Sequence, residues 1–137
     1  MSGERTWAVG DHLPPLDCGR ISRTTLALFA GGSGDHNPIH LDIDTAHAAG
    51  MDDVFAQGML SMAYLGRLIT DNFPQHRLRG FTTRFAAITP VNAHPTCFGE
   101  ITGSDGTSLT VDLRVELADG TRTLTGTATL ALEGSTL

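Results

Sequence analysis

The sequence predicts an α+β fold, in which one central helix packs against an antiparallel β-sheet. Residues 58–73 are apolar on nearly every side, and a helix of that kind has to be buried. Residues 109–117 and 123–132 alternate between apolar and polar side chains, as strands with one buried face do. Packing the helix against the apolar face of the sheet covers both surfaces.

The N-terminal part of the chain predicts an irregular segment followed by short helices. Residues 7–20 include two adjacent prolines, which favour an edge position over a central strand. Ser22 is a suitable N-cap for a helix over residues 23–30, which a pair of glycines ends. Asp44 can cap a second short helix that ends at residue 49. In the central helix that follows, the methionines are predicted to be core residues.

The remaining strands follow from pattern and turn signals. Residues 78–89 and 96–103 are two further strand candidates. Asp119-Gly120 is a two-residue hairpin signal between the last two strands, and Asp105-Gly106 predicts the turn before them. Periodicity leaves the order of the strands open.

The composition indicates a single globular domain over residues 1–137. This length suits one core, and 40% of the residues are hydrophobic. The formal net charge of -6 argues against nucleic acid and anionic membranes, because both select for clustered Lys and Arg. No apolar run approaches the roughly 20 residues that span a bilayer, and the first ten residues lack a signal-peptide core. We therefore expect a cytoplasmic protein, with Cys18 and Cys97 as two buried or partly buried thiols.

Polar residues concentrate in the stretch 29–46. Asp35, Asn37 and His40 lie within six positions, and the proline among them makes this stretch a loop. Adding water to a double bond needs one group that deprotonates water and another that protonates carbon. A carboxylate and an imidazole on one tight loop can both reach a single water molecule. The pattern therefore favours acid–base catalysis by Asp35 and His40.

Three other interpretations of this loop stay open. His36 and His40 have the spacing of two metal ligands on one helix, but the proline between them disfavours a helix. The glycine-rich run around Ser33 resembles a nucleophile elbow, although that motif needs Gly where Asp35 stands. In a purely structural loop, Asp35 and Asn37 would cap backbone amides above His40.

The same loop resembles the hydratase motif of the MaoC-like family, which includes the (R)-specific enoyl-CoA hydratases (hydratase 2). That motif has an aromatic residue, a small-residue pair, Gly-Asp-x-Asn-Pro, an aliphatic residue, His and a later small residue. The layout of the chain is also similar to mycobacterial-type (3R)-hydroxyacyl-ACP dehydratase subunits. The matching positions are Phe29, Ser33, Gly34, Asp35, Asn37, Pro38, Ile39, His40 and Ala46.

The resemblance implies a single hot-dog fold, with an antiparallel sheet wrapped around a long central helix. It implies that Asp35 and His40 are catalytic, that Asn37 supports them, and that the backbone N–H of Gly58 contacts the thioester oxygen. A helix N-terminus offers free N–H groups and the positive end of a dipole, which suits the charge of an enolate. Many relatives carry His before this glycine, whereas this chain has Gln57; a backbone contact survives that difference.

The resemblance therefore predicts reversible hydration of a trans-2-enoyl thioester to an (R)-3-hydroxyacyl thioester, carried by CoA or acyl carrier protein. No metal or organic cofactor is expected. Either Asp35 or His40 could act as the base toward water. The partner in a dimer would be an identical chain or another hot-dog subunit. The alternatives are an acyl-thioester hydrolase on the same fold and a non-catalytic partner subunit of a heteromeric dehydratase.

Overall fold

The computed structural model describes residues 5–132, so the first four residues of the polar N-terminal stretch lie outside the described range. Five antiparallel strands form one sheet in the order β1-β3-β4-β5-β2. Among residues 5–132, no helix has the length and apolar character needed to cross a membrane. The strands are β1 (Leu16–Asp17), β2 (Leu78–Phe85), β3 (Thr96–Ser104), β4 (Ser108–Glu116) and β5 (Arg122–Ala131).

The predicted alternation is confirmed in β4, whereas in β5 it fails at Thr123, which was predicted on the polar face and is fully buried. In β4 the buried positions fall on every second residue from Leu109 to Val115, and they face the core. The predicted strand over 78–89 is shorter than expected, because β2 ends at Phe85. The amides of Ala86 and Ala87 both donate to the carbonyl oxygen of Thr123, which breaks the regular ladder with β5.

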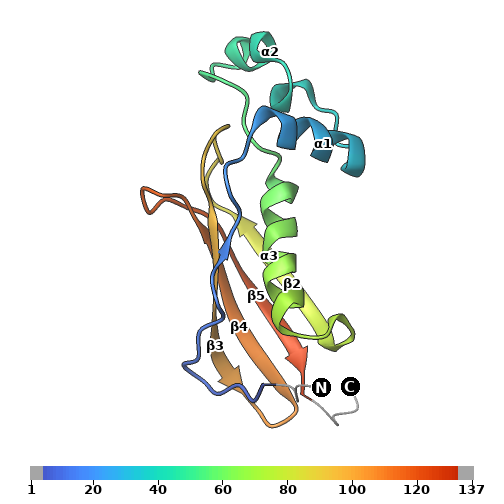
Figure 1. Ribbon diagram of the computed structural model, residues 1–137, viewed down its shortest axis with the longest axis vertical. Coiled ribbons are helices and arrows are strands. Elements are labelled where there is room, and N and C mark those ends of the chain that lie inside the picture. The colour runs from blue at the N-terminus through green and yellow to red at the C-terminus, as the bar shows by residue number, and fades with distance from the viewer. Residues whose placement is uncertain (1–4, 133–137) are drawn as a thin grey trace.

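Helix α3 (Gly58–Asn72) lies along one face of the sheet, as Figure 1 shows. Its Leu65, Leu68 and Ile69 are almost inaccessible to solvent and pack in one core with the apolar faces of β3, β4 and β5. This is the arrangement of the expected hot-dog fold. The prediction that α3 is buried on all sides is wrong at its start, where Met59 is 54% exposed. The sheet covers only one side of the helix, so the opposite side remains accessible.

Two short helices gather at the end of the molecule where α3 begins (Figure 1). Helix α1 (Arg23–Ser33) is capped by Ser22 as predicted, with the hydroxyl oxygen accepting from the amide of Thr25. It continues through the expected glycine stop and ends at Gly34, which has a left-handed conformation with φ of 81°. Glycine adopts this conformation without strain, so Gly34 turns the chain into the loop that follows.

Helix α2 (Ile43–Ala48) begins two residues earlier than predicted. Its N-cap is Asp42 rather than Asp44, because the Asp42 carboxylate accepts from the Asp44 amide and the Thr45 hydroxyl. Two single turns of 3-10 helix complete the fold, η1 (Pro38–His40) and η2 (Gln75–Arg77). A second apolar cluster holds α1 and α2 against the start of α3; it comprises Ile21, Leu26, Ala46, Val54, Ala56 and Leu60.

Candidate active site

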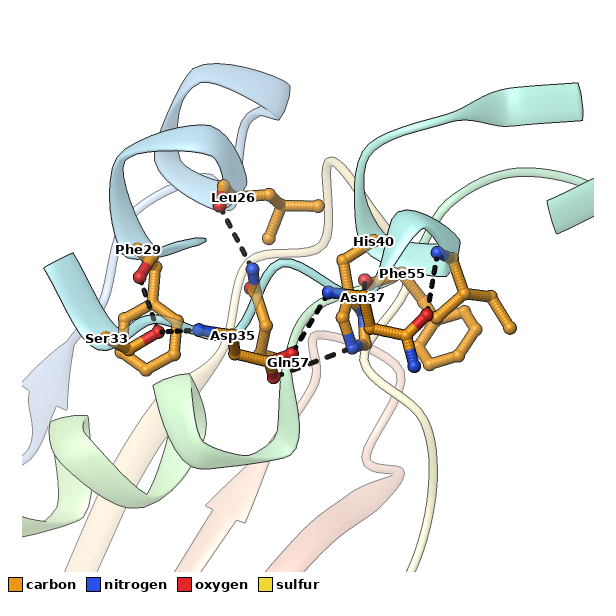
Figure 2. Close-up of polar contacts among 9 residues, drawn as sticks. Leu26, Phe29, Ser33, Asp35, Asn37, His40, Phe55 and Gln57 are labelled. Atoms are coloured by element: carbon orange, nitrogen blue, oxygen red, sulfur yellow. Dashed lines mark hydrogen bonds and ion pairs between the residues drawn. The ribbon is translucent and has the colours of Figure 1, made fainter. Parts of the chain in front are cut away.

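The loop after α1 brings Asp35 and His40 face to face. The carboxylate oxygen Oδ2 of Asp35 lies 3.9 Å from Nε2 of His40, and Figure 2 shows the two side chains pointing toward each other. The Asp35 amide donates to the Ser33 hydroxyl oxygen at 3.1 Å. The backbone N–H of Asn37 donates to Oδ1 of Asp35 at 3.3 Å. These contacts fix the carboxylate so that its second oxygen faces the imidazole.

His40 is held from its other side by the backbone of a distant segment. Its Nδ1 lies 2.7 Å from the carbonyl oxygen of Phe55, and its ring meets the Phe55 ring edge-on with centroids 5.0 Å apart. The His40 side chain is 10% exposed, whereas that of Asp35 is 40% exposed. The imidazole is therefore fixed in the protein, and the carboxylate beside it is open to solvent.

Asn37 reaches the site through its backbone. Its side-chain oxygen accepts from the amide of Ile39 at 3.1 Å and caps η1, while its own amide holds Asp35. Both side chains thus accept backbone amides of the loop, as the structural interpretation expected: Asp35 from Asn37, and Asn37 from Ile39. The structure places Asn37 as a support of the turn that carries Asp35 and His40.

The interpretation of Ser33 as a nucleophile is not favoured by its contacts. Its hydroxyl donates to the carbonyl oxygen of Phe29 at 2.6 Å and accepts from the Asp35 amide. A hydroxyl in this arrangement caps the end of α1 and has its proton directed at a carbonyl. Among residues 5–132, no three His, Cys, Asp or Glu side chains are grouped so that they could hold a metal ion.

Gly58 begins α3 and is exposed. The first amides of a helix have no acceptor within the helix, so the N–H of Gly58 has no partner inside α3. The ring of Phe85 packs closely against Gly58. A Cβ added to Gly58 would lie only 2.9 Å from Cε1 of Phe85. A side chain at this position would therefore meet the aromatic ring.

Two cavities flank the start of α3. One, of about 480 Å³, is mostly apolar and has Asp35 at its wall. The other, of about 320 Å³, lies beside Gly58 and Phe85. The prediction that the methionines are core residues is wrong for the exposed Met59, whereas Met62 packs against the main core and also borders the first cavity. The first cavity is lined by Phe29, Ser33, Asp35, Met59, Met62, Ala63, Gly66 and Phe81.

The segment that leads into α3 contains two residues whose contacts the sequence did not predict. The Phe55 carbonyl holds His40, and no sequence signal identifies a backbone group of this kind. Gln57 is fully buried and its Nε2 donates to the carbonyl oxygen of Leu26 in α1 at 3.0 Å.

At the start of the same segment, the guanidinium of Arg23 binds the Asp53 carboxylate. This contact holds the pKa of the Asp53 carboxyl below its usual range.

Comparison with known proteins gives consistent matches. The model of the MaoC like domain matches residues 11–121. The 3-hydroxyacyl-thioester dehydratase Z of Mycobacterium tuberculosis is 26% identical over 137 residues, which cover 93% of this chain and 82% of that protein. The solved (R)-hydratase from A. caviae involved in PHA biosynthesis is 25% identical, with a TM-score of 0.84 over 93% of this chain and 98% of that one.

A further solved structure is the ChsH1-ChsH2 complex from Mycobacterium tuberculosis. It has a TM-score of 0.84 at 23% identity, over 93% of this chain and 100% of that one. At this identity the likeness concerns the fold. The antiparallel sheet and the central helix found here are thus shared with these proteins.

Proposed function

Because this chain belongs to the MaoC-like domain family, we propose that it catalyses the reversible hydration of a trans-2-enoyl thioester to an (R)-3-hydroxyacyl thioester. The observation that carries the proposal is the pair formed by Asp35 and His40, whose Oδ2 and Nε2 atoms face each other at 3.9 Å. Asp35 stands at the wall of a mostly apolar cavity, which Met59 in the first turn of α3 also lines. The similarity to a hydratase and to a thioester dehydratase supports the same reaction.

The separation of the pair suits one water molecule. A distance of 3.9 Å is too long for a direct hydrogen bond. A water oxygen at about 2.8 Å from both atoms would donate one hydrogen to each. The water would then be oriented by two acceptors, with its lone pair directed toward the substrate.

The contact with Phe55 supports His40 as the base. A carbonyl oxygen only accepts hydrogen bonds, so Nδ1 of His40 must carry the proton. In the neutral imidazole the lone pair then lies on Nε2, the nitrogen that faces Asp35. We assign His40 as the group that takes the proton from water.

The proton balance follows from this assignment. Hydroxide from the water attacks C3 as Nε2 of His40 takes the proton, and the electrons of the double bond move to the thioester oxygen as an enolate. The new hydroxyl on C3 still lies between the two groups; it donates its proton to the Asp35 carboxylate as it receives the proton from Nε2 of His40, and Asp35 then delivers its proton to C2. Both groups return to their starting states. Protonation of C2 from the side of the attacking water gives syn addition.

The start of α3 would stabilise the enolate. The N–H of Gly58 lies at the positive end of a fifteen-residue helix, where negative charge is favoured. An N–H aimed at the developing oxyanion acts more strongly in the transition state than in the ground state. The acyl chain would occupy the apolar cavity that Asp35 borders. The steps need no metal or organic cofactor.

We also propose that the chain works as a dimer, with an identical chain or with another hot-dog subunit. The N-terminal segment covers the outer edge of β3, through bonds from Gly10 and Leu13. Strand β2 ends the sheet on the other side, next to the exposed Phe85 and Ile88. Open strand edges favour pairing with another strand. Since CoA and carrier-protein thioesters are intracellular substrates, the proposal places the chain in the cytoplasm.

Product analysis tests the reaction. The purified chain is given trans-2-enoyl-CoAs from short to long, while the conjugated enoyl absorbance and free thiol are followed. We expect loss of absorbance without thiol release, and an (R)-3-hydroxyacyl-CoA on chiral chromatography. Thiol release would instead indicate hydrolysis. A chain that is inactive on the whole panel would contradict the proposal and favour a non-catalytic partner subunit.

A further inference from the structure

We propose that Gln57 is a positioning residue for hydration: it ties α1 to the start of α3 and so sets Asp35 relative to the N–H of Gly58. The inference rests on the proposed function, because it concerns the distance between the water-holding pair and the oxyanion donor. Gln57 itself does not touch the substrate, since its side chain is fully buried. Its effect would be transmitted through the position of α1.

Residues 55–58 connect the separate parts of the site. The Phe55 carbonyl accepts from His40, Gln57 donates to Leu26 in α1, and Gly58 starts α3. Helix α1 leads directly through Gly34 into Asp35. A single stretch of four residues therefore places the imidazole, the carboxylate and the oxyanion donor relative to one another. Figure 2 shows Gln57 reaching up to α1 beside Asp35.

The orientation of the Gln57 amide is fixed by its partner. The Leu26 carbonyl oxygen can only accept, so Nε2 has to face it and Oε1 has to face away. Oε1 is inaccessible to solvent and receives no hydrogen bond from any part of residues 5–132. The side chain thus makes one directional contact and leaves its second polar atom unpaired.

Stability alone does not account for this amide. A buried polar oxygen without a partner destabilises the folded state, and removing it can offset the loss of one neutral hydrogen bond. Methionine has a similar length and shape and would leave no unpaired oxygen. The apolar contacts of Leu26 with its cluster also hold α1, but apolar packing is not directional. The directional bond from Gln57 defines where α1 lies.

The first experiment compares Gln57→Met with a matched control. Thr123→Val likewise removes a fully buried oxygen without a partner, here Oγ1, from a strand outside the proposed machinery. We expect both variants to melt at or near the wild-type temperature. Gln57→Met should lose kcat by about tenfold or more, because small displacements of reacting groups slow catalysis strongly. KM should change little, and Thr123→Val should keep the wild-type kcat.

The second experiment separates positioning from a general structural effect. Gln57→Met is combined with Asp35→Asn, and the four proteins are assayed on the enoyl-CoA that the wild type hydrates fastest. If Gln57 acts by placing Asp35, its replacement should have little further effect once the carboxylate is gone. A merely structural role predicts that the two losses multiply. Should Gln57→Met fail to fold, Gln57→Leu also removes the N–H donor without burying an unpaired polar group and should show the same coupling.

The outcomes distinguish this inference from the proposed function. Full turnover in Asp35→Asn would contradict the proposed function itself. A strong loss in Asp35→Asn together with wild-type kcat in Gln57→Met would contradict only the role of Gln57. A loss in Gln57→Met that multiplies with that of Asp35→Asn would also overturn it.

Discussion

Nδ1 of His40 lies 2.7 Å from the carbonyl oxygen of Phe55, a residue fifteen positions further along the chain. This bond selects the tautomer that has its lone pair on Nε2, toward Asp35. A backbone carbonyl at the entrance to α3 thereby gives the imidazole its proposed role as a base. The bond also couples the loop that carries Asp35 and His40 to the segment that ends at Gly58.

Replacing Asp35 and His40 tests whether they act on one water molecule. Asp35→Asn keeps the shape but removes the carboxylate, and His40→Gln removes the imidazole. Each change should lower turnover by roughly a hundredfold or more. The double variant should lose far less than the product, because groups that act as a unit are not additive. Steady-state kinetics on one good enoyl-CoA gives all three values.

Thermal melts of the same variants provide the control. Asp35 accepts one amide bond in its turn, and a capping contact is worth about 1 kcal/mol. We therefore expect small shifts in melting temperature. Two single variants with wild-type turnover would exclude the proposed mechanism, whereas unstable variants with normal turnover per folded molecule would mean that the loop is structural.

Two substitutions of Gly58 isolate its N–H. Gly58→Pro removes the donor at a position where a helix tolerates proline. Gly58→Ala keeps the donor, and both variants place a Cβ against the Phe85 ring. Turnover of the proline variant should fall by about a hundredfold or more below that of the alanine variant, the usual effect of losing one oxyanion donor. Equal turnover in two folded variants would remove Gly58 from the mechanism.

The open edge of β2 predicts a dimer in solution. Light scattering of the purified chain should give twice the 14.5 kDa chain mass at micromolar concentration. The exposed Phe85 and Ile88 near this edge would then be covered by the partner. A single monomeric species at that concentration would contradict the homodimer. Recovery of the dimer mass only after another hot-dog subunit is added would identify the heteromeric form.

The sequence predicted most of the fold because its local signals agree with the tertiary structure. Strand β4 shows the expected alternation of burial, and Ser22 caps α1 as its side chain suggests. The end of β2 was not predictable from pattern, since it depends on bonds from Ala86 and Ala87 to a strand far along the chain. The exposure of Met59 likewise depends on which side of α3 the sheet covers.

The sequence predicted the local part of the candidate site but not its long-range contacts. Asp35, Asn37 and His40 form a local motif, so their proximity could be inferred before the fold was known. The roles of Phe55 and Gln57 depend on contacts across long sequence separations. The first contact is made by a backbone carbonyl, which no sequence pattern marks. Gln57 stands out in the sequence as a departure from the His of many relatives, but its bond to α1 is seen only in the three-dimensional structure.

The thiol pair predicts selective chemistry at Cys18. Its Sγ lies 3.6 Å from that of Cys97, which is fully buried while Cys18 is partly exposed. The hydrogen bond from Cys97 lowers the pKa of the Cys18 thiol, and the same bond together with burial raises the pKa of Cys97. A lowered pKa means more thiolate near neutral pH, and the thiolate is the reactive form. Iodoacetamide should therefore modify Cys18 and leave Cys97 intact in the native protein, as mass spectrometry of peptides would show.

Cys97→Ala tests the cause of this reactivity. The variant lacks the thiol that donates to Cys18, so the pKa of Cys18 should rise and its alkylation at neutral pH should slow. Well above the ordinary thiol pKa of about 8.5, Cys18 is ionised in both proteins and the two rates should converge. This convergence separates an effect on ionisation from a change in access to the sulfur. Equal rates at neutral pH would mean that the contact with Cys97 does not control the Cys18 thiolate.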